Sequence, residues 1–535
     1  MRKSSLTLSL LGVAALSLSL QTTTALAAST LVYCSEGSPE NFTPALNTTG
    51  TSFDAARPVY DQLVLFKRGS TEVIPGLAES WKITDGGKTV TFSLRKGVKF
   101  HSGVNGFTPS RDFNADDVLW TINRMWKAEH PYHKTSGGAY DYFNDMDMPK
   151  LIKAVTRVDD YTVKMELTEA NVTIMANLAM DFATVHSAEY ADFLTKAGKQ
   201  EQFDQIPVGT GPFVFQSYQK DAVIRYKANP GYWGEKSKVD NLVFAITPDA
   251  TARYAKLKAS ECHVSAYVRP ADLPEMQKDS ALQVYNQPGL NINYLSLQVT
   301  KKPFDDKRVR KAIGLAIDQQ AIIKDVYLGA GTAAKNLIPP TMWSYNNKIP
   351  AYEYNVEKAK KLLADAGVKT PIDIDLWWMP VQRPYNPNAK RIGEMIQSDL
   401  AKVGINAKLV SFEWGEYRKR MQAGEHTTGQ MGWMGDNGDP DNFFFLAACN
   451  DGVPTQNNQS KWCNPEFNKL FEAAKTMAKK SDRVAAYSRM QEIMNDEQSH
   501  YFIAHSVVYE VTRKEVKGYR QSPFGSHVFN GVSVE

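Results

Sequence analysis

The pattern of hydrophobic and polar positions along the 535-residue chain predicts a mixed α/β protein. Residues 241–267 read as an apolar strand, a helix and a second strand in succession. A hairpin is predicted over 80–103, where Val90, Phe92 and Leu94 share one face beyond the turn at 85–87. Asn114 is placed to cap a helix that runs to about Met125. This part of the chain therefore combines strands with helices.

A second unit is predicted from about residue 291, where an alternating strand is followed by a helical pattern at 306–318. Further on, a helix at 356–366 leads to a strand at 372–378, and a helix at 388–403 leads to a strand at 407–412. A late strand at 501–511 is expected to lead back into the first unit. The length of the chain also favours two or three domains.

The N-terminus has the features of a secretory signal peptide. Arg2 and Lys3 precede an apolar run from Leu6 to about Leu20, and Ala25-Leu26-Ala27 follows, with the small residues suited to cleavage. A membrane anchor is the alternative, but it needs about 20 uninterrupted apolar residues, whereas serines dilute this run. Because the residue before Cys34 is a bulky tyrosine, a lipoprotein site is not expected. We predict cleavage after about residue 28.

The charge balance argues against a polyanionic partner such as nucleic acid. The formal charge is +4, and loss of Arg2 and Lys3 leaves 60 basic against 58 acidic residues. An exported chain meets an oxidising compartment, so the four cysteines are expected to form two disulfides. Three pairings are possible, and the short spacing of Cys449 and Cys463 favours a local link that leaves Cys34 for Cys262. A zinc site is the alternative, but CxxC spacing is absent.

Residues 431–445, MGWMGDNGDPDNFFF, carry the most informative cluster of charges. Asp436, Asp439 and Asp441 stand among turn-forming residues directly after an apolar strand. Such a turn aims a carboxylate into a cleft, although aspartates in turns also cap their own backbone. Asp436, three residues after Trp433, is the favoured ligand-binding carboxylate.

A second candidate loop follows the strand predicted at 372–378. Residues 379–387 contain three prolines and a single cation, Arg383, whose planar fork suits a carboxylate. A solvated surface arginine is the alternative interpretation. Ligands of open α/β sheets lie beyond the carboxyl ends of strands, so opposite charges on two such loops predict a grip on a zwitterion. The polar loop 35–50 offers further hydroxyls, or is an ordinary connection.

The sequence lacks the familiar signatures of catalysis and of nucleotide or calcium binding. The sequence has no GxSxG elbow and no HExxH motif. The acidic turn is not an EF-hand, because Ala447 stands where the bidentate glutamate belongs. Lys82 likewise replaces the first glycine of a phosphate loop. We therefore predict neither an enzyme nor a bound cofactor or metal.

Six segments of the chain are characteristic in combination: LVYCSEGSPENFTPAL, GTGPF, VRKAIGLAID, KNLIPPTMW, MPVQRPYNPNA and GWMGDNGDPDNFF. Together they resemble the peptide-binding branch of the solute-binding proteins of ABC importers, and its dipeptide-binding members most of all. The resemblance implies a two-lobed α/β periplasmic binding protein with an extra subdomain in the first lobe and a ligand cleft between the lobes. It implies a first lobe at 29–289 with an inserted subdomain at about 61–208, a second lobe at 290–505 and a return segment at 506–535.

The resemblance also implies roles for individual residues. Asp436 would hold the ammonium of a dipeptide and Arg383 its carboxylate. Further contacts would come from Thr48, Pro384, Tyr385, Trp433, Met434 and Gly435. The disulfides implied, Cys34 with Cys262 and Cys449 with Cys463, agree with the spacing argument. The expected protein is a periplasmic monomer that delivers its ligand to an inner-membrane permease.

Two alternatives stay open at this point. The same fold serves proteins for longer peptides, haem or a nickel chelate, and for the last two a histidine in the cleft is expected. A secreted peptidase is the enzymatic alternative.

Overall fold

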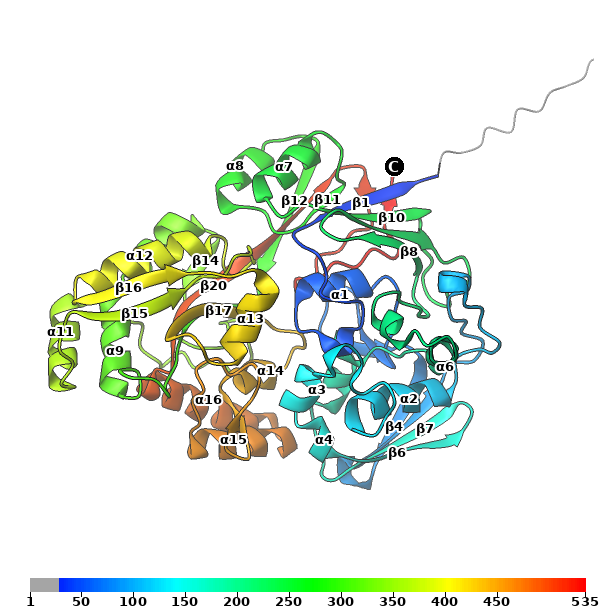
Figure 1. Ribbon diagram of the computed structural model, residues 1–535, viewed down its shortest axis with the longest axis horizontal. Coiled ribbons are helices and arrows are strands. Elements are labelled where there is room, and N and C mark those ends of the chain that lie inside the picture. The colour runs from blue at the N-terminus through cyan, green and yellow to red at the C-terminus, as the bar shows by residue number, and fades with distance from the viewer. Residues whose placement is uncertain (1–27) are drawn as a thin grey trace, which may run out of the picture.

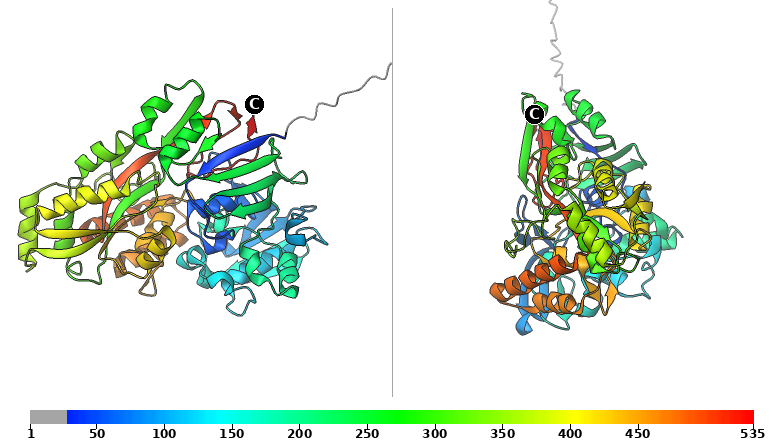
Figure 2. Two further views of the ribbon diagram at one scale, coloured as in Figure 1. Left: turned by 45° about the horizontal axis from the view of Figure 1, so that its top comes forward. Right: turned by 90° about the vertical axis from the view of Figure 1, so that its left-hand side faces the viewer.

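The computed structural model describes residues 28–535, so the expected signal peptide lies outside the described part except for its last residue. Two lobes lie side by side and share one twelve-stranded sheet (Figures 1 and 2). The strands follow the order β16 (Ile405–Val410), β15 (Ile372–Trp377), β17 (Thr428–Met434), β13 (Asn291–Leu297), β20 (His500–Arg513), β11 (Val264–Ser265), β1 (Thr30–Ser35), β10 (Asn241–Ile246), β9 (Val223–Ala228) and β8 (Phe213–Gln219). β12 (Leu282–Pro288) and β14 (Gly331–Ala333) also pair with β20.

β20 belongs to both lobes. Its first residues pair antiparallel with β13, and its last residues pair with β12 and β11. β12 leads into β13, so the chain crosses between the lobes at the β12–β13 connection and again within β20, and these two crossings are adjacent. Gly289 lies at this crossing and donates its N–H to the Ser506 carbonyl oxygen at 3.0 Å. A Cβ at Gly289 would collide with the Asn291 side chain and the Ser506 carbonyl, so the close crossing requires glycine here.

The second lobe contains the strand–helix alternation that the sequence predicts. Its helices α9 (Lys307–Ala316), α11 (Val356–Asp365), α12 (Ala389–Ala401) and α13 (Trp414–Gln422) each begin after a side chain that accepts a backbone N–H. Such N-caps satisfy donors that the first helical turn leaves free. β15 and β16 are parallel, and β17 is parallel to β15, with the last two residues of β15 opposite the first two of β17. α15 (Pro465–Thr476) and α16 (Lys480–Glu497) complete this lobe (Figure 1).

In the first lobe, β1 lies between β10 and β11, both parallel to it. The helix α7 (Ala250–Lys258) connects β10 with β11, which confirms the predicted strand–helix–strand unit. A separate antiparallel sheet has the order β4 (Ala78–Thr84), β5 (Thr89–Leu94), β7 (Thr162–Leu167) and β6 (Ile152–Asp159). Helix α2 (Ala115–Trp126) contacts this sheet and begins with a capping box between Asn114 and Asp117, as its predicted start requires.

The remaining helices and strands are short. They are α1 (Gly50–Ala56), β2 (Val64–Phe66), β3 (Val73–Pro75), α3 (Asp141–Asp145), α4 (Met148–Leu151), α5 (Ile174–Leu178), α6 (Ala188–Lys196), α8 (Leu273–Met276), α10 (Gln319–Ile322), α14 (Asp441–Phe444), β18 (Cys449–Asn450), β19 (Val453–Pro454), β21 (Val516–Lys517) and β22 (Ser533–Val534).

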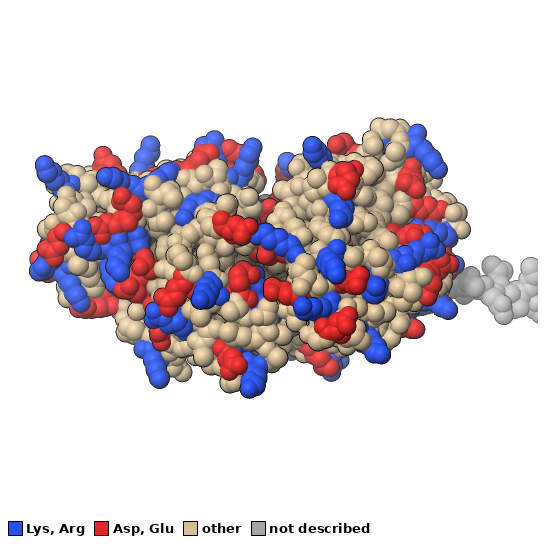
Figure 3. Space-filling view, turned by 90° about the horizontal axis from the view of Figure 1, so that it is seen from below, with Lys and Arg blue, Asp and Glu red and all other residues tan. Residues whose placement is uncertain are grey.

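Both predicted disulfides are present. Cys34 is bonded to Cys262 and Cys449 to Cys463, with Cα–Cα distances of 5.8 Å in each pair. Between residues 28 and 535, no helix has the length and apolar character needed to span a membrane. Seen from below, a notch separates the lobes, and basic and acidic side chains are interspersed on this face (Figure 3).

Candidate functional site

A cavity of about 80 Å³ lies between the lobes, and we call it the central cavity. Its walls are formed by the start of α1, the loops after β15 and β17, helix α13 and residues 524–526. β15 and β17 run in the same direction, and the loop after β15 continues alongside β17, where Tyr385 lies against Gly432. Arg383 and Asp436 thereby reach one cavity.

The structure brings most of the predicted site residues together. Six of the eight line the central cavity: Thr48, Arg383, Tyr385, Trp433, Met434 and Asp436. Pro384 and Gly435 are not among its lining residues, and both act through the backbone. The Pro384 carbonyl accepts a hydrogen bond from Ser506 Oγ at 2.8 Å, and the Gly435 N–H donates to Leu290 O at 2.7 Å.

Asp436 is held by the turn that the sequence predicts. The Asn442 Oδ1 atom accepts both the Asp436 N–H at 2.7 Å and the Trp433 indole N–H at 3.2 Å. The Asp436 carboxylate is partly buried and accepts a hydrogen bond from the Tyr142 hydroxyl, which comes from the first lobe. Burial raises the pKa of Asp436 to about 7; Asp181 adds to this effect, while the Tyr142 hydrogen bond and Arg57 oppose it. The carboxyl is therefore poised to ionise when a cation approaches.

The other two aspartates of the turn do not line the central cavity. Asp439 forms two hydrogen bonds with Arg483 of α16, at 2.6 and 2.7 Å, and also accepts the Asp441 N–H at 3.2 Å. Asp441 is buried, and burial together with the charge of Asp439 raises its pKa to about 8. The backbone-capping interpretation therefore holds for Asp439, which in addition anchors the turn to α16.

Arg383 is buried rather than solvated. One of its terminal nitrogens donates to Glu36 Oε1 at 3.0 Å, and the other donates to Thr51 Oγ1 at 3.3 Å. Its guanidinium lies 5.1 Å from the centre of the Trp414 ring. Burial works to lower the pKa of Arg383, but Glu36, through its charge and hydrogen bond, together with Tyr267 and Tyr385 outweighs it and the pKa is raised. The cation is thus paired across the lobes and stays charged.

Several residues of this site were missed in the sequence. Glu36, Tyr142 and Arg57 contact or neighbour the candidates, and Arg418 lines the cavity and donates to Thr48 and to both Glu40 oxygens, at 2.8 and 3.0 Å. Glu36 and Glu40 lie in the loop 35–50, in which the sequence draws attention to hydroxyl groups rather than to carboxylates. A buried or paired carboxylate has no signature that separates it from a solvated one in sequence.

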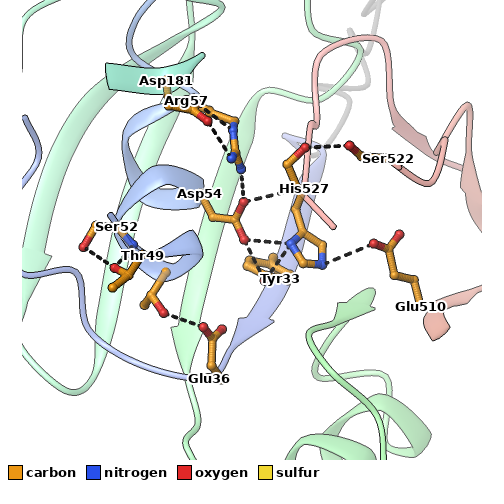
Figure 4. A network of polar contacts seen from close by, with 12 residues as sticks. Tyr33, Glu36, Thr49, Ser52, Asp54, Arg57, Asp181, Glu510, Ser522 and His527 are labelled. Carbon is orange, nitrogen blue, oxygen red and sulfur yellow. Dashed lines mark hydrogen bonds and ion pairs between the residues drawn. The ribbon is translucent and has the colours of Figure 1, made fainter. Parts of the chain in front are cut away.

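A buried polar network lies behind the site, in the first lobe (Figure 4). Arg57 pairs with Asp54 and with Asp181, and Asp54 also accepts from His527 Nδ1 at 2.7 Å. Burial works to lower the pKa of His527, but Asp54 raises it to about 8. His527 Nε2 lies 3.9 Å from Glu510 of β20, whose pKa is raised to about 7 by burial. The network joins α1, the C-terminal segment and β20.

Comparisons with known proteins agree with this architecture. Residues 72–454 match the bacterial extracellular solute-binding proteins, family 5. The chain is 54% identical over 509 residues to the dipeptide-binding protein of Escherichia coli (strain K12), with 95% of each chain covered. It is 48% identical over 509 residues to heme-binding protein A of Haemophilus influenzae, covering 95% of this chain and 92% of that protein.

A solved structure gives the same result. The dipeptide binding protein from Pseudoalteromonas sp. SM9913 in complex with Met-Leu has a TM-score of 0.90 and 37% sequence identity, covering 95% of this chain and all of that one. The match to the family extends over most of the chain, and the identities hold over nearly its full length. The chain therefore belongs to the bacterial extracellular solute-binding proteins, family 5, and has their two-lobed fold.

Proposed function

We propose that this protein captures dipeptides by their charged termini and delivers them to the inner-membrane permease of an ABC importer. The observation that carries the proposal is the meeting of Asp436 and Arg383, of opposite charge, in one cavity between the lobes. A zwitterion supplies a partner for each of them. The similarity to dipeptide-binding proteins in both sequence and structure supports this ligand class.

The ligand ammonium would bind Asp436 and the ligand carboxylate would bind Arg383. Each of these residues belongs to the second lobe, and each already contacts the first lobe, through Tyr142 and Glu36 respectively. A bound dipeptide would therefore reach groups of both lobes at once. This arrangement couples ligand binding to closure of the cleft, because an open cleft separates the two sets of groups.

We further propose the division of the chain at 29–289, 290–505 and 506–535, with the inserted subdomain at about 61–208. The two halves of β20, which pair with different strands, support a boundary near residue 505. The protein would act in the periplasm after removal of residues 1–28, as a monomer and without a nucleic-acid partner. The four-stranded sheet formed by β4 to β7 falls within the proposed subdomain.

Calorimetric titration tests the proposal. Ala-Ala with free termini is expected to bind, whereas N-acetylated and C-amidated Ala-Ala are expected to bind at least about tenfold more weakly, because each leaves one buried charge without its partner. Single amino acids and tripeptides serve as length controls. Equal affinity for the doubly blocked peptide would show that the two charges do not grip the termini.

Haem is a second candidate, because heme-binding protein A is a relative over nearly the whole chain. Among the described residues, those that line the central cavity include no histidine. A haem titration followed by absorbance, with and without saturating Ala-Ala, separates the two functions. Competition would place haem in the same cleft, and free amino acids appearing from Ala-Ala would instead indicate a peptidase.

A further inference from the structure

A second cavity, of about 360 Å³, opens from the first-lobe side of the site. We call it the outer cavity, and its walls are the β2–β3 hairpin and the segments 179–184, 232–235 and 520–530. It shares four lining residues with the central cavity: Arg57, Asp436, Phe524 and Ser526. The two cavities therefore meet at the carboxylate that is proposed to hold the ligand ammonium.

One wall of the outer cavity is apolar. Leu65, Phe66 and Ile74 line it, and the Phe66 ring packs against Phe524 with the ring centres 4.7 Å apart. Thr184 also belongs to the lining and is only 2% exposed.

Nearly all the charged side chains that line the outer cavity are paired with, or hydrogen-bonded to, other protein groups. Arg68 pairs with Glu235 at 3.5 Å, and Asp61 accepts hydrogen bonds from three side chains at 2.8–3.0 Å. Arg520 is exposed and forms no hydrogen bond or ion pair with any other residue in 28–535. An apolar wall and one cation without a protein partner favour the binding of neutral and acidic ligand groups over basic ones.

Covalent geometry decides which part of a dipeptide reaches this space. The ammonium and the side chain of the first residue are bonded to the same Cα, so a side chain begins within two bonds of the ammonium. With the ammonium on Asp436, that side chain starts where the two cavities meet. Arg383 lines the central cavity and not the outer one, so the second residue runs away from the outer cavity.

The sizes of the two cavities then predict a preference. One water needs about 10–15 Å³ on this measure, so the central cavity has room for about six waters. The outer cavity is more than four times larger. Resting on the proposed function, we propose that the outer cavity receives the side chain of the first residue, so that the protein selects dipeptides with a large first and a small second side chain.

Calorimetry with Ala-Ala, Phe-Ala and Ala-Phe tests this preference in the full-length mature protein. Phe-Ala is expected to bind at least about tenfold more tightly than Ala-Phe. Ile74→Trp fills the outer cavity from its apolar wall, and it is expected to weaken Phe-Ala by about tenfold while leaving Ala-Ala within about twofold. Ile83→Trp is the matched control, because Ile83 is 48% exposed on β4 and lines neither cavity.

The charge at the mouth gives an independent readout. Glu-Ala is expected to bind more tightly than Lys-Ala, and Arg520→Ser is expected to reduce the difference. The proposal is overturned if Ala-Phe binds as tightly as Phe-Ala, or if Ile74→Trp weakens all three peptides alike while Ile83→Trp does not. If none of the three binds to the parent protein, the proposed function fails and this inference fails with it.

Discussion

Dipeptide binding is expected to depend on pH through Asp436. Its carboxyl must be ionised to hold an ammonium, and burial in the cleft raises its pKa to about 7. The sign follows directly: below pH 7 the carboxyl is mostly protonated, so binding has to expel a proton and becomes weaker. Above pH 7 the Asp436 carboxyl is mostly ionised, and binding weakens again only when the ligand amine loses its proton near pH 8.

The size of the effect follows from the fraction ionised. With a pKa of about 7, about half of the Asp436 carboxyls are ionised at pH 7 and about one in a hundred at pH 5. The association constant should therefore fall about 50-fold between these values, which corresponds to about 2.3 kcal/mol. Near pH 6 about 0.9 protons should be released for each ligand bound.

Calorimetric titrations of Ala-Ala between pH 5 and 8, repeated in buffers of different ionisation enthalpy, measure both quantities. Asp436→Asn should bind about 30-fold to several thousand-fold more weakly at pH 7, because it leaves the ammonium without its charge partner. Its remaining affinity should not change between pH 5 and 7. Asp439→Asn is the matched control, since Asp439 pairs with Arg483 and should leave the pH profile unchanged.

Constant affinity of the parent from pH 5 to 7 would refute this reasoning. The same 50-fold fall in Asp436→Asn would refute it as well, since another group would then control the profile. Each variant must be fully folded at the temperature of the titration, because Asp439→Asn also loses its pair with Arg483 and a loss of fold would be mistaken for a loss of binding.

Three further outcomes are expected. The pKa of Glu510 rises from 4.5 to about 7 on folding, so its contribution to stability is complete below pH 4.5 and is lost as pH rises through 7. Glu510→Gln should flatten the pH dependence of the unfolding free energy, measured by denaturant titration, by up to about 3 kcal/mol. Gly432→Ala would drive a Cβ into the Tyr385 ring, so it should lower the free energy of unfolding in denaturant titrations by about 1–3 kcal/mol and weaken dipeptide binding. Unchanged stability and binding would contradict the close contact between Gly432 and Tyr385. Glu36→Gln leaves Arg383 without its buried partner and should lower the stability of the ligand-free protein by about 3 kcal/mol. Adding Ala-Ala should raise the melting temperature of this variant more than that of the parent, because the ligand carboxylate then supplies the missing partner. An equal rise would show that the ligand carboxylate does not replace Glu36.

Local features of the sequence were sufficient to predict the elements that carry the site. The caps at Asn114, Asn355 and Asn388 mark helix starts because they act within three residues of their own position. The meeting of Arg383 with Asp436 was predictable for a similar reason. Both follow strands that run in the same direction, so the loops after them lead toward the same side of the lobe, although β15 ends five residues before β17.

The partners of these charges could not be predicted, because they come from distant parts of the chain. Arg383 and its partner Glu36 are 347 residues apart, and Asp436 and Tyr142 are 294 residues apart. Periodicity reports which face of an element is buried, but it does not report which other element covers that face. The sequence favours Asp436 as the ligand-binding aspartate of the turn, but the role of Asp439 depends on Arg483, which α16 supplies.

The crossing of β20 between the lobes has a consequence for the order of folding. The second lobe is built from one continuous stretch, from β13 to the first half of β20. The first lobe needs both ends of the chain, because β11 pairs with the last residues of β20 and the His527 N–H donates to Asp54 at 3.1 Å. When the chain emerges N-terminus first, the first lobe cannot complete its fold until the final residues arrive. The second lobe begins later in the sequence, but it is able to complete its fold earlier.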